Sequence, residues 1–113
     1  TTLPDSYVTK STWTPVATNL TIVGTPTYVG TFERIGDFVS FTIRVTSTTT
    51  TAATAGTTSF STPTSTVVAG TCVAASNVTA IGYGTGLVNS NVIYVPTWAA
   101  SADVIITGQY FAA

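Results

Sequence analysis

The sequence has 113 residues, of which 44% are hydrophobic and 6% are charged, and its formal net charge is -1 at pH 7. This length suits one domain, and a chain with so much hydrophobicity and so little net charge is not intrinsically disordered. Lys10, Arg34 and Arg44 are the only basic residues in the sequence, which are too few to bind a nucleic-acid backbone.

The surface of the domain is expected to be poor in charge. The mean hydropathy is +0.45, whereas soluble monomers usually disperse charged side chains over their surface. The composition therefore predicts an obligate oligomer, in which copies of the chain cover much of the surface. No apolar run approaches the roughly 20 residues of a membrane-spanning helix, so no membrane association is predicted.

Residues 1–12 are predicted to be a linker from a longer chain, and residues 13–113 a single domain. The first five residues, Thr-Thr-Leu-Pro-Asp, have neither the basic start nor the apolar stretch of a signal peptide. The chain also lacks an initiator methionine, which favours an excised or processed piece of a larger protein.

Short segments rich in Thr, Val, Tyr and Ile recur along the chain and are separated by Gly, Pro and Asn. This pattern is typical of strands, and no long segment repeats apolar residues at helical spacing. The predicted strands cover residues 12–17, 19–23, 27–35, 38–46, 57–61, 66–74, 77–83, 91–95 and 104–111. About nine short antiparallel strands predict an all-β domain of the β-sandwich or jelly-roll type.

The clearest element is a hairpin over residues 27–46. Gly36 and Asp37 form a two-residue turn signal between Ile35 and Phe38, because glycine supplies the positive φ that such turns need. In the second strand, four apolar residues alternate with polar ones and define a core face: Val39, Phe41, Ile43 and Val45. Pairing Ile35 with Phe38 brings three partners to that face: Tyr28 opposite Val45, Gly30 opposite Ile43, and Phe32 opposite Phe41.

Two segments have the composition of loops and turns. Residues 47–58 contain only Ser, Thr, Ala and Gly, so they are predicted to form a low-complexity loop that adds little to the core. Residues 82–86 read Gly-Tyr-Gly-Thr-Gly, but no amphipathic helix follows, so a glycine turn is predicted instead of a dinucleotide site. Cys72 is predicted to fill a small core position.

The residue types needed for common catalytic sites are scarce. Histidine is absent from the sequence, which removes the usual general base and the commonest metal ligand. The four acidic residues, Asp5, Glu33, Asp37 and Asp103, show no arrangement that suggests a pair of catalytic carboxylates. We therefore expect no enzyme activity, no metal site and no cofactor.

Aromatic side chains are the best candidates for binding, since flat apolar rings stack against sugar faces at little cost in side-chain entropy. Each ring also has a structural alternative, in which it closes an end of the core or lies in a subunit interface. The candidates for glycan contact are Trp13, Tyr83, Tyr94 and Trp98.

Three separated segments each match a different part of one further sequence pattern. Residues 13–15 read W-T-P, and residues 30–39 fit G-x-Y-x-(K/R)-I-G-(N/D)-x-V, with Phe32 in place of the usual Tyr. Residues 98–110 supply a tryptophan, a turn and a G-x-Y strand. Together these segments resemble a module found near the C terminus of bacteriophage tail fibres and tailspikes. The motif residues of the hairpin are Tyr28, Gly30, Phe32, Ile35, Gly36, Asp37, Val39 and Phe41.

The resemblance implies a domain of a virion adhesin on the phage tail, exposed to the extracellular medium. Such modules assemble as homotrimers beside upstream fibre or spike domains, support trimer formation, and attach to bacterial surface polysaccharide. A trimer agrees with the low charge, because contacts between copies would cover surface that is poor in charged side chains. Three weak glycan sites in one trimer would also bind together more tightly than a single site. Two alternatives stay open: a monomeric carbohydrate-binding module, and a capsid decoration or head-fibre domain.

Overall fold

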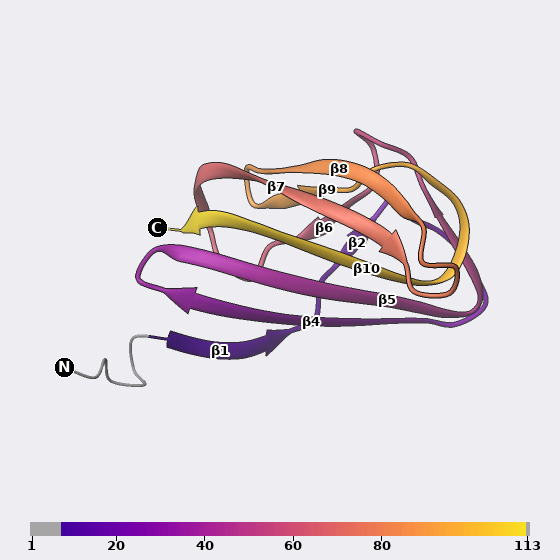
Figure 1. Ribbon diagram of the computed structural model, residues 1–113, viewed down its shortest axis with the longest axis horizontal. Helices are drawn as coiled ribbons and strands as arrows, with labels where there is room; N and C mark the ends of the chain where they lie inside the picture. Colours follow the sequence, from indigo (N-terminus) through magenta and orange to yellow (C-terminus); the bar gives the residue numbers. More distant parts are fainter. Residues whose placement is uncertain (1–7, 113) are drawn as a thin grey trace.

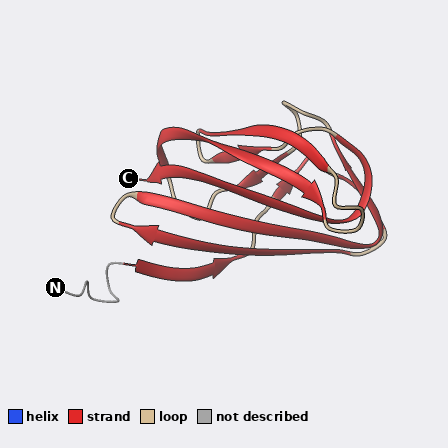
Figure 2. Cartoon of the chain, in the orientation of Figure 1, coloured by secondary structure: helices blue, strands red, loops and turns tan. Residues whose placement is uncertain are grey.

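The computed structural model describes residues 8–112, and every regular element in this part of the chain is a β-strand (Figure 2). The strands are β1 (Val8–Trp13), β2 (Ala17–Thr18), β3 (Thr21–Val23), β4 (Pro26–Ile35), β5 (Phe38–Ala53), β6 (Ser59–Ser61), β7 (Thr66–Ser76), β8 (Gly82–Asn89), β9 (Val92–Tyr94) and β10 (Trp98–Ala112). The predicted all-β class is confirmed. Residues 8–112 include no helix with the length and apolarity that crossing a membrane requires.

The strands form one antiparallel sheet in the order β1-β4-β5-β10-β7-β8-β9-β6-β2, with β3 beside β5. The sheet curls over on itself (Figure 1), so that the rings of Tyr28 on β4 and Phe60 on β6 lie 6.0 Å apart. β1 and β2 stand at opposite ends of this order and are joined by residues 14–16. Hydrogen bonds between Val16 and Ser61 hold the connection against β6. The result is a sandwich-like domain made from a single curled sheet.

The hairpin predicted for residues 27–46 is confirmed together with its register. Ile35 pairs with Phe38 across the turn, and Gly36 has a φ of 59°, a left-handed value that favours glycine. The three predicted pairs are all observed: Tyr28 with Val45, Gly30 with Ile43, and Phe32 with Phe41.

The core lies on the inner face of the curled sheet. Phe41 stands near its centre, with the rings of Trp13 and Tyr110 at centroid distances of 6.4 and 6.2 Å. Full burial of one such large apolar side chain stabilises a fold by about 1.5–3 kcal/mol. The largest buried side chains are Trp98, Tyr110, Phe41, Phe60, Ile43, Ile93, Ile106, Val39, Val45, Val88, Val95 and Val104.

The predicted loop over residues 47–58 is wrong for its first half. β5 continues to Ala53, pairs with β3 over residues 50–52, and buries both Thr51 and Ala53. The Thr51 hydroxyl donates to the Ser101 carbonyl at 2.8 Å, so this polar group enters the core with a partner. Only residues 54–58 form the connection between β5 and β6.

The connection between β7 and β8 also differs from the prediction. Residues 77–81, predicted as strand, form a turn in which the Ala80 N–H donates to Ser76 O at 3.1 Å. Residues 82–86, predicted as a glycine turn, are the first part of β8. Gly86 is needed there because a Cβ at this position would collide with the carbonyl oxygen of Tyr94.

The predicted boundary between linker and domain falls inside a strand. β1 begins at Val8 and pairs with β4, so residues 8–12 belong to the sheet. The first strand therefore ends at Trp13, and the prediction of strand to Ala17 is wrong across residues 14–16. The rest of the predicted linker, residues 1–7, lies outside the described residues.

Candidate functional site

Trp13 closes one end of the core. Its ring lies on Gly30 and contacts Phe32 edge to face at a centroid distance of 5.7 Å. Its Nε1 donates to Ser61 O at 3.2 Å, which links β1 to β6 across the opening of the sheet. The Trp13 ring was a candidate either for glycan contact or for closing an end of the core, and these contacts favour the second role.

Trp98 and Tyr83 form a stacked pair, with centroids 5.7 Å apart and planes inclined by 27°. Trp98 is only 2% exposed, and its Nε1 donates to both the carbonyl and the hydroxyl oxygen of Thr51 at 3.2 Å. Trp98 is therefore a core residue that fixes the start of β10. Tyr83 is half-buried, with one face of its ring covered by Trp98.

Tyr94 is the candidate ring that stands beside a groove. The groove has a volume of about 390 Å³ and lies between β8, β9 and the β5–β6 connection. Leu87, the cross-strand partner of Tyr94, is 45% exposed within it. The lining residues are Ala55, Gly56, Thr85, Gly86, Leu87, Tyr94 and Val95.

The wall of this groove formed by the β5–β6 connection is held in place by hydrogen bonds. The Ala55 N–H donates to the Thr97 hydroxyl at 2.8 Å, and the Thr58 N–H donates to Thr54 O at 2.9 Å. Thr58 is fully buried, and its hydroxyl donates to Asn19 O at 2.8 Å. These hydrogen bonds fasten the β5–β6 connection to Thr97 and Asn19.

A second groove, of about 460 Å³, crosses the outer face of β1, β4 and β5. The Lys10 ammonium and the Glu33 carboxylate line it and lie 3.5 Å apart. Both side chains are largely exposed, so this ion pair adds little to stability. The neighbouring Phe32 is already in contact with Trp13.

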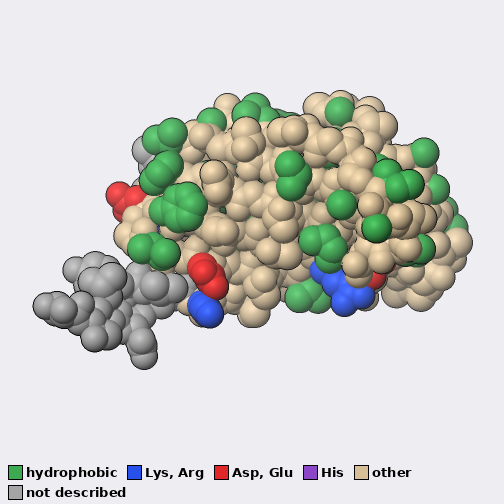
Figure 3. All heavy atoms as spheres, viewed as in Figure 1, with side chains coloured by type: hydrophobic (Ala, Val, Ile, Leu, Met, Phe, Trp, Pro, Cys, Tyr) green, Lys and Arg blue, Asp and Glu red, His purple; other side chains and the backbone are tan. Residues whose placement is uncertain are grey.

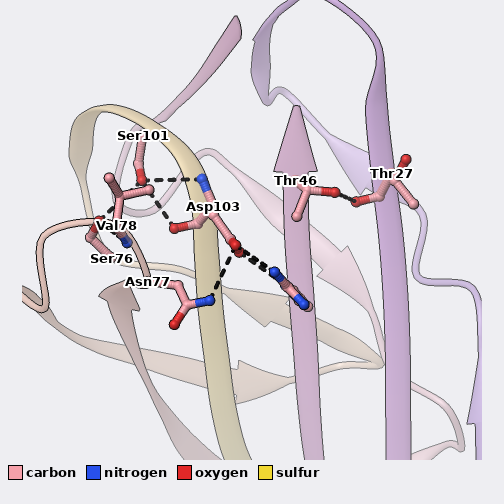
Figure 4. A network of polar contacts seen from close by, with 8 residues as sticks. Thr27, Thr46, Ser76, Asn77, Val78, Ser101 and Asp103 are labelled. Carbon is pink, nitrogen blue, oxygen red and sulfur yellow. Dashed lines mark hydrogen bonds and ion pairs between the residues drawn. The ribbon is translucent and has the colours of Figure 1, made fainter. Parts of the chain in front are cut away.

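Asp103 anchors a cluster of polar side chains at the β7–β8 turn (Figure 4). Its carboxylate lies 2.7 Å from the Arg44 guanidinium and accepts a hydrogen bond from Asn77 at 3.1 Å. Arg44 is the main reason that the pKa of Asp103 lies below its ordinary value, and burial opposes this shift. The cluster joins β5, β10 and the turn, which is a structural role.

Cys72 occupies the core, as predicted, and its thiol donates to Tyr94 O at 3.4 Å. Burial raises the pKa of this thiol to about 11, so it stays protonated at neutral pH. Within residues 8–112, no three His, Cys, Asp or Glu side chains lie close enough together to hold a metal ion.

Sequence reasoning identified Tyr94 as a candidate but missed its neighbours Leu87 and Gly56. Leu87 follows a glycine-rich run that looked like a turn, and Gly56 lies in a segment without any distinctive residue. No family model, curated protein or solved structure matches this chain.

Proposed function

We propose that this chain is a structural and adhesive C-terminal domain of a bacteriophage tail fibre or tailspike. In this proposal the domain is a homotrimer in the virion and helps the phage attach to bacterial surface polysaccharide. One observation carries the proposal: the three segments of the phage-like pattern, far apart in sequence, meet in space. Trp13 packs on Gly30 of the hairpin, and Phe41 of the hairpin contacts Tyr110 of the last strand.

An exposed apolar row supports assembly of several chains. Four side chains on the outer face are cross-strand neighbours over β4, β5, β10 and β7: Ile35, Phe38, Phe111 and Val68. Ile35, Phe111 and Val68 are 48%, 47% and 54% exposed, and the Phe38 and Phe111 rings lie 5.6 Å apart. Hydrophobic side chains gather at this end of the molecule (Figure 3), and the Arg34–Asp37 ion pair lies at the adjoining β4–β5 turn. A contiguous apolar patch of this kind is typical of an interaction surface.

Light scattering of the purified chain tests the proposed trimer. We expect a mass three times the chain mass of 11.6 kDa, and a shift toward monomer in Phe111→Ser. The matched control is Val78→Ser, which changes an exposed valine in the β7–β8 turn and leaves the row intact. A stable monomer at all concentrations would contradict the trimer and favour a stand-alone carbohydrate-binding module.

Binding to purified bacterial surface polysaccharides tests the adhesive part of the proposal. We expect the chain to bind at least one capsular or lipopolysaccharide glycan and to release no new reducing ends from it. Locating the protein in fractionated virions shows whether it belongs to the tail or to the head. A position on the capsid would contradict the tail fibre and favour the head-fibre alternative.

A further inference from the structure

Tyr94 differs from every other described aromatic residue. Residues 8–112 contain eleven aromatic side chains, and ten of them take part in ring pairs with centroids no more than 6.4 Å apart. Tyr94 is the one that joins no such pair, and its hydroxyl makes no hydrogen bond to the described part of the chain. Aromatic pairs contribute to stability beyond the area they bury, and the half-buried Tyr94 ring makes no such pair, so it is free to stack on a ligand.

The groove beside Tyr94 offers two kinds of contact. Leu87 and the Tyr94 ring supply apolar surface, and the Tyr94 and Thr85 hydroxyls supply hydrogen-bonding groups. Gly56 has a φ of 78° and would place a Cβ in open space, so this wall is low and leaves the groove accessible. The β5–β6 connection and the strands β8 and β9 that form the groove lie at the same side of the domain (Figure 1).

None of the described residues that line the groove carries a charge. An acidic sugar would lose water there without gaining a cationic partner, which disfavours its binding. An uncharged sugar has an apolar C–H face and a rim of hydroxyls, which match the ring, Leu87 and the two hydroxyl groups. The volume of about 390 Å³ falls at the small end of ligand sites and suits a short stretch of glycan.

We infer that this groove binds an uncharged sugar unit of the bacterial surface polysaccharide, with the Tyr94 ring stacked on the sugar. The inference rests on the proposed adhesive function and deepens it by naming the site and the ligand class. The second groove, over β1, β4 and β5, is the competing location. Its Lys10–Glu33 ion pair and its already paired Phe32 ring make it a poorer match for a neutral sugar.

The test is a titration of the full chain with single sugars, followed by methyl NMR. The probes are the methyl glycosides of glucose, galactose, mannose, rhamnose and N-acetylglucosamine, with glucuronic acid and N-acetylneuraminic acid as acidic counterparts. We expect at least one neutral glycoside to shift the methyl signals of Leu87 and Ala55. The methyl signals of Val29, which is exposed on the outer face of β4, should stay in place.

Three variants assign the binding to the ring. Tyr94→Ala should weaken binding by about fivefold or more, the loss expected for one stacking contact, while Tyr94→Phe should retain most of it. Lys10→Ala is the matched control in the second groove and should bind like the parent chain. Leu87→Thr provides an independent test on an exposed strand position, in case Tyr94→Ala melts far below the parent.

The outcomes separate this inference from the proposed function. Sugar binding that persists in Tyr94→Ala and Leu87→Thr, or that disappears in Lys10→Ala, overturns the assignment of the groove and leaves adhesion standing. Binding of the acidic sugars alone overturns the ligand class. Failure of every glycoside in the panel overturns the inference, while the separate polysaccharide and scattering measurements decide the proposed function.

Discussion

The ring of Trp13 lies against the backbone of its cross-strand partner Gly30, so closely that a Cβ at position 30 would stand 2.7 Å from ring carbon Cε3. Gly30→Ala should therefore displace the ring and break the hydrogen bond from Trp13 Nε1 to Ser61 O. We expect a loss of roughly 1–3 kcal/mol in the free energy of unfolding, as for other overpacked cores. Denaturant unfolding monitored by tryptophan fluorescence measures both effects.

The control for Gly30→Ala is Gly82→Ala, because a Cβ at Gly82 in β8 would meet no atom within 4 Å. This change should alter stability by less than about 0.5 kcal/mol. Equal losses in the two variants would show that the glycine effect is a general cost of changing a strand glycine and does not come from the Trp13 contact.

Phe41 and Thr42 are adjacent residues on opposite faces of β5. Phe41 is 2% exposed and Thr42 faces solvent, as the register of the hairpin requires. Phe41→Ala should cost roughly 3–5 kcal/mol of unfolding free energy, whereas Thr42→Ala should cost less than about 0.5 kcal/mol. Thermal denaturation of both variants checks the assignment, and similar melting temperatures would refute it.

Thr51 tests the part of β5 that was predicted as a loop. Thr51→Val keeps the shape of the side chain but removes the hydroxyl that bonds to Ser101 O and Trp98 Nε1. The Ser101 carbonyl then loses this donor, while Trp98 Nε1 keeps only its bond to Thr51 O, and the loss should cost about 1–3 kcal/mol of unfolding free energy. Thr49→Val, at an exposed position of the same strand, should be nearly neutral by the same chemical denaturation assay.

Asp103 should make the protein sensitive to acid. A carboxyl whose pKa is lowered by folding stabilises the native state at neutral pH, and this contribution is lost as the pH falls below about 4 and through the folded pKa. Asp103→Asn should lower the stability of the protein at pH 7. The difference in stability between this variant and the parent should become smaller at acid pH. Melting temperatures between neutral and acid pH measure this, and Arg44→Gln should reproduce the effect.

Cys72 should make the protein sensitive to alkali. Its folded pKa of about 11 exceeds the ordinary value of 9.0, so stability is intact below the ordinary value and falls as the pH rises from there toward 11. Cys72→Ala should show a smaller alkaline decline than the parent. In the native parent at neutral pH, a thiol reagent should modify Cys72 only as fast as the chain unfolds.

The hairpin was predictable because all the necessary signals are local. Alternation set the face of Phe41, and the Gly36 turn then fixed every pair back to Tyr28. Trp98 was harder, because a tryptophan near a proline looks the same in a surface platform and in a core. Its burial depends on Thr51, which comes 47 residues earlier in the chain.

The wrong secondary-structure predictions concern segments whose composition differs from what is usual for their place in the fold. Residues 47–53 lack apolar alternation, yet they form strand because β3 and β10 supply neighbours on both sides. The glycines of residues 82–86 are typical of a turn. Position 86, however, lies in a strand and requires glycine because the Tyr94 carbonyl oxygen leaves no room for a Cβ. The groove depends on how these two misjudged segments meet, so local patterns did not reveal it.

The position of β10 has a consequence for how the chain acquires its structure. β10 is last in sequence but lies between β5 and β7, so it joins the β1-β4-β5 half of the sheet to the β7-β8-β9 half. A chain synthesised only as far as Val95 would hold two partial sheets with exposed edges and no strand between them. Folding of the whole domain therefore waits until β10 has left the ribosome, and a nascent chain stalled before β10 is exposed to misfolding and aggregation.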